Sequence, residues 1–183
     1  MWLTGDPRAD ELLADDNALL IGMCLDQQIT MEKAFSGPRV LADRMGGTLD
    51  VGRIAATPVD EFVAIMAERP AIHRFPANMG KRVHALCEVL VNEYDGDAGR
   101  IWSSGSGAEI LTRLEALPGF GEQKATIFLA LLGKQRGLTA SGWRQAAGDY
   151  GLDGYRSVAD ITDEASLLEV RAHKKAAKAA AKG

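Results

Sequence analysis

The fold is decided by the stretch Ile110-Leu111-Thr112-Arg113-Leu114-Glu115-Ala116-Leu117-Pro118-Gly119-Phe120-Gly121-Glu122-Gln123-Lys124-Ala125-Thr126-Ile127-Phe128-Leu129. An amphipathic helical pattern runs into a glycine-rich turn, and a second apolar helical pattern leaves it. Gly119 and Gly121 carry no Cβ, so the chain can turn tightly there and its backbone can approach another group closely. The stretch predicts two helices, 107–116 and 121–136, with the Leu117 and Phe120 side chains fixing the turn to the core.

Helical periodicity also dominates the rest of the chain, and no segment of four or more residues alternates as a strand does. Thr30 and Ser106 are expected to cap helices, and Thr57 followed by Pro58 is typical of a helix start. We therefore expect an all-α fold. The expected helices cover residues 8–14, 15–28, 30–45, 57–68, 76–94, 97–102, 107–116, 121–136, 141–147 and a last segment from Thr162.

The composition fits one helical domain over residues 1–170, because 183 residues with 46% hydrophobic content can bury a sizeable core. Cys24 and Cys87 lie in apolar helical patterns and are expected to be buried, reduced thiols. Two cysteines without a CxxC pair do not suffice for a four-thiolate iron–sulfur cluster or a structural zinc site. The three histidines are scattered and form no metal-ligand pattern, so no metal is expected; they are His73, His84 and His173.

The charge pattern argues against strong long-range attraction to a polyanion. The formal net charge is −4, so binding to nucleic acid would have to depend on local contacts. No apolar run is long enough for a membrane span, and residues 1–6 do not resemble a signal peptide, so we expect a cytoplasmic protein without a membrane partner. Acidic residues crowd 6–16 and 60–68, whereas basic residues gather at Arg69-His73-Arg74, Lys81-Arg82, Lys134-Arg136 and 171–183.

The glycine turn has the features of an anion site. The amides from Phe120 to Gln123 would point outward at a helix N-terminus, where the helix dipole favours a negative group. Lys124 would add a positive charge for a neighbouring phosphate. The alternative is that the turn only reverses the chain between two helices.

These residues resemble the helix-hairpin-helix (HhH-GPD) base-excision DNA glycosylase superfamily, whose hairpin reads Leu-Pro-Gly-hydrophobic-Gly. The resemblance covers about residues 15–137 and does not extend to the C-terminal part. It implies two helical lobes with a cleft between them: a central lobe of residues 30–137, and a second lobe of 1–29 with 138–170. It also implies that double-stranded, damaged DNA is bound by Leu117, Pro118, Gly119, Phe120, Gly121, Glu122, Gln123 and Lys124.

A further part of the resemblance is Leu25-Asp26-Gln27-Gln28-Ile29-Thr30, which looks like the segment that supplies a glutamine near the DNA minor groove. A glutamine amide can hydrogen-bond the base left unpaired when its partner nucleotide is flipped out. Gln28 is the better candidate and Gln27 its neighbour; a solvent-exposed helix end is the alternative. Lys81 and Arg82 begin a stretch that resembles the family's basic helix and are further DNA-binding candidates.

The chain departs from the family at the catalytic positions. The family places an essential Asp about two dozen residues after the hairpin leucine, which falls near Ser141 in this sequence, and no carboxylate lies between Glu122 and Asp149. The nucleophilic lysine of lyase-competent members corresponds to Gln123, so lyase activity is not expected. Asp149 and Asp26 remain candidate catalytic acids. The alternatives are a DNA-binding protein that does not cut, and activation of water by a group that the sequence does not identify.

Trp143 and Arg144 could line a base pocket by stacking, although a buried core role for Trp143 is the alternative. Residues 171–183 form a Lys/Ala-rich tail, interpreted either as a solvated helix or as a basic arm for phosphates. We expect no cofactor, although a monovalent cation at the hairpin is left open. We also expect the protein to be a monomer. Three functions are compatible with the sequence: a monofunctional glycosylase, a non-catalytic DNA-binding module, and an interaction protein that uses the hairpin only for packing.

Overall fold

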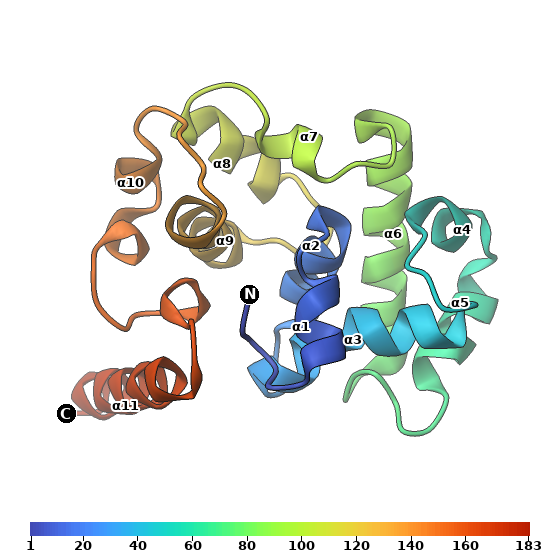
Figure 1. Ribbon diagram of the computed structural model, residues 1–183, viewed down its shortest axis with the longest axis horizontal. Coiled ribbons are helices and arrows are strands. Elements are labelled where there is room, and N and C mark those ends of the chain that lie inside the picture. The colour runs from blue at the N-terminus through green and yellow to red at the C-terminus, as the bar shows by residue number, and fades with distance from the viewer.

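The computed structural model describes residues 1–183 as an all-helical protein without a strand, as the sequence predicted. Figure 1 shows the helices as one continuous body, with the C-terminal helix along its lower left side. None of the helices combines the length and the apolar character needed to cross a membrane. The elements are α1 Pro7–Leu12, α2 Asp16–Leu25, α3 Met31–Arg44, α4 Val51–Ala56, α5 Val59–Ala67, α6 Pro76–Tyr94, α7 Gly99–Trp102, α8 Gly107–Glu115, α9 Glu122–Gln135, α10 Trp143–Ala146, η1 Gly148–Gly151, η2 Val158–Asp160 and α11 Glu164–Ala181.

Helix α2 is the centre of the core. All of its residues from Ala18 to Leu25 are buried, so it has no solvent face beyond its first turn. A helix that is apolar all round belongs inside a protein, and Figure 1 shows α2 between α6 and α9. Asp15 caps its N-terminus by accepting from the Ala18 amide. Its C-terminal end at Leu25 leads directly into the loop on which the candidate site is built.

The remaining helices pack in two groups around α2. In the first group, α1 packs on α3, and α6 packs on α2, α4 and α5. In the second group, α9 packs on α8, α10, η1 and η2, while α11 reaches the body mainly through η2. The sequence had placed residues 1–29 with the C-terminal segment, whereas α1 and α2 make their main helix contacts with α3 and α6. The division into two lobes stays a prediction.

Several helix boundaries differ from the predicted ones for local reasons. The helix predicted over 15–28 ends at Leu25, because Asp26 takes a non-helical conformation. Pro58, not Thr57, is the N-cap of α5, and the Thr57 hydroxyl instead donates to the Arg53 carbonyl. Helix α4 was missed, since six residues capped by Asp50 carry too little periodicity to be recognised.

The two thiols are buried and unpaired, as predicted. Burial raises the pKa of the Cys24 thiol to about 11 and raises that of Cys87 as well. A thiol that stays protonated is a poor nucleophile and a poor metal ligand. Both residues therefore act as small core side chains, and Cys24 does so directly beneath the α8–α9 turn.

Candidate nucleic-acid interface

The turn between α8 and α9 is anchored on its inner side. Leu117 and Phe120 are only 4% and 5% exposed, and the Phe120 ring packs edge-on against Phe128 with centroids 6.1 Å apart. Gly119 has a φ of +79°, and a Cβ built there would lie 3.0 Å from the Cys24 Sγ. The turn thus rests on the end of α2, and any DNA contact by Leu117 or Phe120 has to come from the backbone.

The outer side of the same turn is open. A Cβ built on Gly121 would meet no atom within 4 Å, and Gly121 is the N-cap of α9 without a side-chain capping bond. The amides of Gly121, Glu122, Gln123 and Lys124 donate to no acceptor in the protein. These four free N–H groups lie at the positive end of a helix of 14 residues, an arrangement that is suited to an anion.

Lys124 ties α9 to the end of α2. Its Nζ donates to the Cys24 carbonyl over 2.9 Å and lies 5.9 Å from the centre of the Phe120 ring. Burial lowers the pKa of Lys124, while Cys24 and Asp26 oppose that shift. The sequence had placed this ammonium on a DNA phosphate. In the structure the ammonium is half-buried and binds a carbonyl in the last turn of α2, so it holds the α8–α9 turn next to the 26–30 loop.

The loop of residues 26–30 is held by His73, a residue that sequence reasoning left unused. The His73 Nδ1 accepts from the Phe75 amide over 2.9 Å, so the other ring nitrogen carries the proton. That Nε2–H donates to the Gln27 carbonyl over 2.9 Å. Burial lowers the pKa of His73, with the bond to Gln27 acting in the opposite direction, so the ring is neutral near pH 7.

The two glutamines of this loop have different roles. The Gln27 Oε1 accepts from Arg82 over 2.9 Å, so both its side chain and its carbonyl are fixed. Gln28 is exposed, and its side chain makes no hydrogen bond within the protein. Its φ of +59° is uncommon for a residue with a Cβ and indicates a conformation imposed by the surrounding structure. The free amide is thus that of Gln28, the residue preferred from the sequence.

Gln28 lies between two surface hollows. The α9–α11 hollow, of about 730 Å³, brings Gln28 together with Gln123 and Asp149. The α6 hollow, of about 210 Å³, brings both glutamines together with Arg82. Residues far apart along the chain, predicted separately, therefore share one surface around a single loop. Lys81 is exposed on the same helix as Arg82 and makes no contact with a protein acceptor.

Phe75 belongs to this surface and was missed from the sequence. It is 41% exposed, an unusual state for a phenylalanine, and the Arg74 guanidinium lies 5.3 Å from its ring centre. It lines the α6 hollow beside Gln27 and Gln28. In the sequence, its position before Pro76 indicates only the start of a helix. The signal that could have identified it as a site residue is its apolar side chain within a basic loop.

The two candidate carboxylates differ in their environments. Asp149 is exposed in η1 and faces the α9–α11 hollow, where Gln123 donates to the neighbouring Tyr150 hydroxyl over 2.9 Å. Asp26 is half-buried at the end of α2. Burial raises the pKa of Asp26, while the nearby Lys174 and Lys124 pull it down. Asp26 is therefore a carboxyl that holds its proton more strongly than usual, directly before the two glutamines.

Trp143 and Arg144 lie apart from this surface. The Trp143 ring packs over Gly133 of α9, where a Cβ would come within 2.5 Å of it. Arg144 stacks on the same ring at 4.6 Å and donates to the Gly151 carbonyl. Neither residue lines a hollow together with Gln28. The core role left open for Trp143 is the one that the packing supports.

The chain matches no model of a known protein family, and no curated protein has a matching sequence. The structure contains no group of three or more His, Cys, Asp or Glu side chains placed to hold a metal ion. The chemical groups that this surface offers are free amides, a free glutamine, exposed cations and one shielded carboxyl.

Proposed function

We propose that this protein binds damaged double-stranded DNA and acts as a base-excision protein of the helix-hairpin-helix type. One observation carries the proposal: the open amides after Gly121 and the free Gln28 are both built on the C-terminal end of α2. Gly119 rests on Cys24, Lys124 donates to the Cys24 carbonyl, and Gln28 follows three residues after the helix ends. An anion grip and a probing side chain thus share one rigid support.

The grip would act on the sugar-phosphate backbone. A phosphodiester has room to approach Gly121, and the unpaired amides from Gly121 to Lys124 would donate to its oxygens. Arg82 and Lys81, exposed on α6, would contact further phosphates. Such contacts fix the register of a protein on a duplex without reading its sequence.

Gln28 would enter the duplex. Its exposed side chain belongs to a loop that His73 and Arg82 keep fixed through Gln27. An enzyme that acts on a base must take that base out of the stack, and a side chain then fills the gap. The exposed Phe75 ring on the neighbouring α6 hollow offers a stacking surface for the adjacent base.

The reaction that we propose is hydrolysis of the N-glycosidic bond of the extruded base. Water adds to the sugar C1′, the bond from C1′ to the base nitrogen breaks, and the base leaves with a proton from a carboxyl, which the surplus proton of the added water then replaces. A carboxyl with a raised pKa is suited to give up that proton as a general acid. The candidate is Asp26, which follows the end of α2 two residues before Gln28 and whose pKa burial raises. Gln123 stands where lyase-competent members carry a nucleophilic lysine, so the proposed product is a base-free site with an intact strand.

Non-catalytic DNA binding is the second candidate, and one observation favours it. Ser141, at the position expected for the family's essential Asp, is followed by the Gly142 cap of α10, and the segment offers no carboxylate. The nearest acid downstream, Asp149, is exposed and makes no side-chain hydrogen bond. A protein with this surface would bind bent or damaged duplexes without cutting them.

The two candidates are separated by a glycosylase assay on duplexes carrying a panel of damaged bases, beside a binding assay on the same duplexes. The enzyme predicts base release that Asp26→Asn abolishes while binding persists, with Asp60→Asn, an exposed residue of α5 away from both hollows, as the matched control. Gln28→Ala should weaken binding to duplexes with a base-free site more than binding to intact duplexes. Binding without release by the wild type selects the non-catalytic protein, and no binding at about 50 mM salt removes both.

A further inference from the structure

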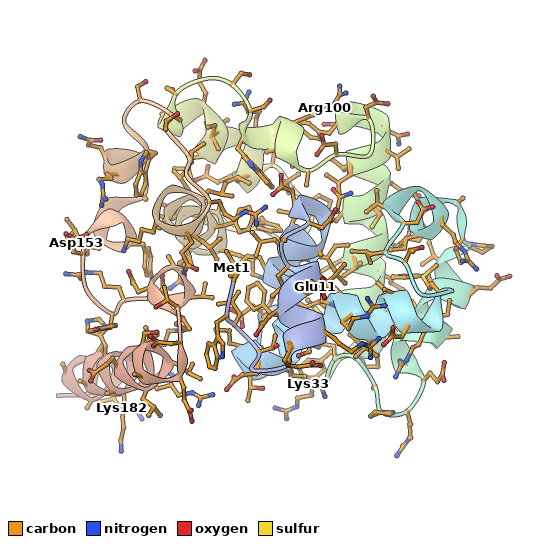
Figure 2. All side chains as sticks on the ribbon, in the orientation of Figure 1. Met1, Glu11, Lys33, Arg100, Asp153 and Lys182 are labelled. Atoms are coloured by element: carbon orange, nitrogen blue, oxygen red, sulfur yellow. The ribbon has the colours of Figure 1, made fainter.

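A group of basic side chains gathers in the α9–α11 hollow, on the side of Gln28 away from Arg82. Arg156, Lys174 and Lys178 line it together with His173, and Asp149 is the one carboxylate among its lining residues. Figure 1 shows α11 along the outside of the body, and Figure 2 labels Lys182, at its end, and Lys33 of α3 toward the same lower side of the view.

These basic groups are not used by the protein itself. Lys174, Lys178 and the Arg156 guanidinium make no ion pair and donate to no protein acceptor, and the Arg156 Nε is shielded from solvent without a partner. The contrast is Arg171, one turn before Lys174, which pairs with Glu32 at 2.6 Å. Three cations thus line a hollow with a single carboxylate, Asp149, and with Asp26 near Lys174, so the hollow keeps an excess of positive charge that a bound anion would offset.

Core packing does not account for the position of this helix end either. In α11 only Ser166, Leu167 and Val170 are buried, and every residue from Arg171 onward is exposed. His173, Lys174, Ala177 and Lys178 nevertheless recur at helical spacing on one face, which is the face that lines the hollow. The basic tail is therefore a solvent-exposed helix of which one face lines the hollow, and both interpretations of it from the sequence remain open.

We propose that the α9–α11 hollow is a second phosphate-binding site, which takes the sugar-phosphate backbone of DNA on the opposite side of Gln28 from Arg82. This inference rests on the proposed DNA binding and adds α11 to it as a contact arm. Gln28 lines both hollows, so a backbone gripped on both sides would hold the duplex while the glutamine enters it. Arg156, Lys174 and Lys178, which line this hollow, would supply the positive charges.

The test compares two double variants of α11 with equal charge. Lys174→Gln with Lys178→Gln removes two cations that line the hollow, and Lys175→Gln with Lys182→Gln removes two that do not. Removing one cation from a phosphate should make the slope of log Kobs against log[salt] shallower by about 0.9 on duplex DNA, so the first variant should have a slope shallower by about 1.8. The control variant should keep the wild-type slope. Circular dichroism checks that all proteins have the same helix content.

The outcomes separate this inference from the function on which it rests. Wild-type binding with a shallower slope for the Lys174/Lys178 variant only supports the second site. If the wild type binds and both variants keep its slope, or if both slopes become shallower by the same amount, the second site is overturned. The proposed binding of phosphate by the α8–α9 turn is then unaffected. A wild type that binds no duplex at low salt overturns both proposals together.

Discussion

Gly119 and Gly121 lie two residues apart in the α8–α9 turn, and their surroundings differ. Gly119 is pressed against Cys24 with a φ of +79°, a left-handed conformation that costs a residue with a Cβ about 1–2 kcal/mol. Gly121 has extended backbone and empty space where a Cβ would lie. The first glycine is needed for the fold, and the second for access to the amides behind it.

The pair Gly119→Ala and Gly121→Ser should therefore separate stability from binding. We expect Gly119→Ala to lower the free energy of unfolding by about 1–2 kcal/mol. We expect Gly121→Ser to keep or raise it by a few tenths of a kcal/mol, because serine is a good N-cap for α9. The serine hydroxyl would occupy the amides that phosphate needs, weakening DNA binding by about tenfold or more. Urea unfolding and fluorescence anisotropy measure the two effects; unchanged affinity in Gly121→Ser would contradict the grip.

His73 gives the 26–30 loop a pH dependence. Its ring must stay neutral to accept from the Phe75 amide, and burial lowers its pKa below the ordinary value of 6.5. The unfolded chain therefore binds a proton at a higher pH than the folded one. The stability that His73 contributes is complete above pH 6.5 and is lost as the pH falls toward the lower folded-state pKa.

We expect the free energy of unfolding to fall as the pH is lowered from 7 through the window below 6.5, and to fall less in His73→Gln. The glutamine amide keeps a donor for the Gln27 carbonyl but does not titrate. Chemical denaturation of both proteins at a series of pH values is the measurement. Parallel pH profiles for the wild type and the variant would show that the histidine does not carry this dependence.

At the scale of elements, Lys124 joins the first turn of α9 to the last turn of α2. Replacing it by Met removes the donor to the Cys24 carbonyl and should lower the free energy of unfolding by about 1–3 kcal/mol. Lys81→Met is the control, since Lys81 is exposed without a protein partner and should change stability by about 0.5 kcal/mol at most. Thermal unfolding of the two variants tests the difference, and equal losses would remove the joining role.

Local signals in the sequence predicted most of the elements. The period of the apolar residues gives α6 with its observed bounds, and Ser106 with Glu109 forms the capping box that starts α8. Where the signal is short or ambiguous the prediction failed, as for α4 and for the N-cap of α5, which is Pro58 rather than Thr57. Local chemistry fixes these features, so a single sequence suffices for them.

The candidate site was only partly predictable, because its members meet through long-range packing. The glycine turn and Gln28 were recognised from their own neighbours in sequence. The Gln27–His73 bond and the packing of Trp143 on Gly133 join distant residues, and no local pattern encodes them. For the same reason the structure, not the sequence, brings the face of α11 to Gln28.

At the scale of the whole molecule, the two groups of helices are tied together through the ends of α2 and α9. Arg136, directly after α9, pairs with Asp16 and donates to the Ala14 carbonyl over 2.8 Å, next to the start of α2. Lys124 makes the corresponding bond at the other end of both helices. A duplex that contacts α6 on one side and α11 on the other would thus meet a rigid support rather than two independent arms.

The net charge of −4 sets how the whole molecule approaches DNA. Local cations supply the contacts, while acidic side chains elsewhere repel the polyanion at long range. Glu11 and Glu93 are exposed, unpaired and close to the C-terminal ends of α1 and α6, where a negative charge is unfavourable for the helix. Along α6, Glu93 is about 18 Å from Lys81, so it takes no part in the proposed contacts.

Glu11→Gln with Glu93→Gln should therefore accelerate association with DNA without changing the complex. At low salt we expect the association rate to rise about two- to threefold, a small share of the range known for electrostatic steering. The dissociation rate should stay the same, because neither carboxylate touches the proposed interface. At about 1 M salt, where the Debye length is near 3 Å, the advantage should vanish. Stopped-flow mixing with a labelled duplex measures both rates, and a changed dissociation rate would place one of these residues inside the interface.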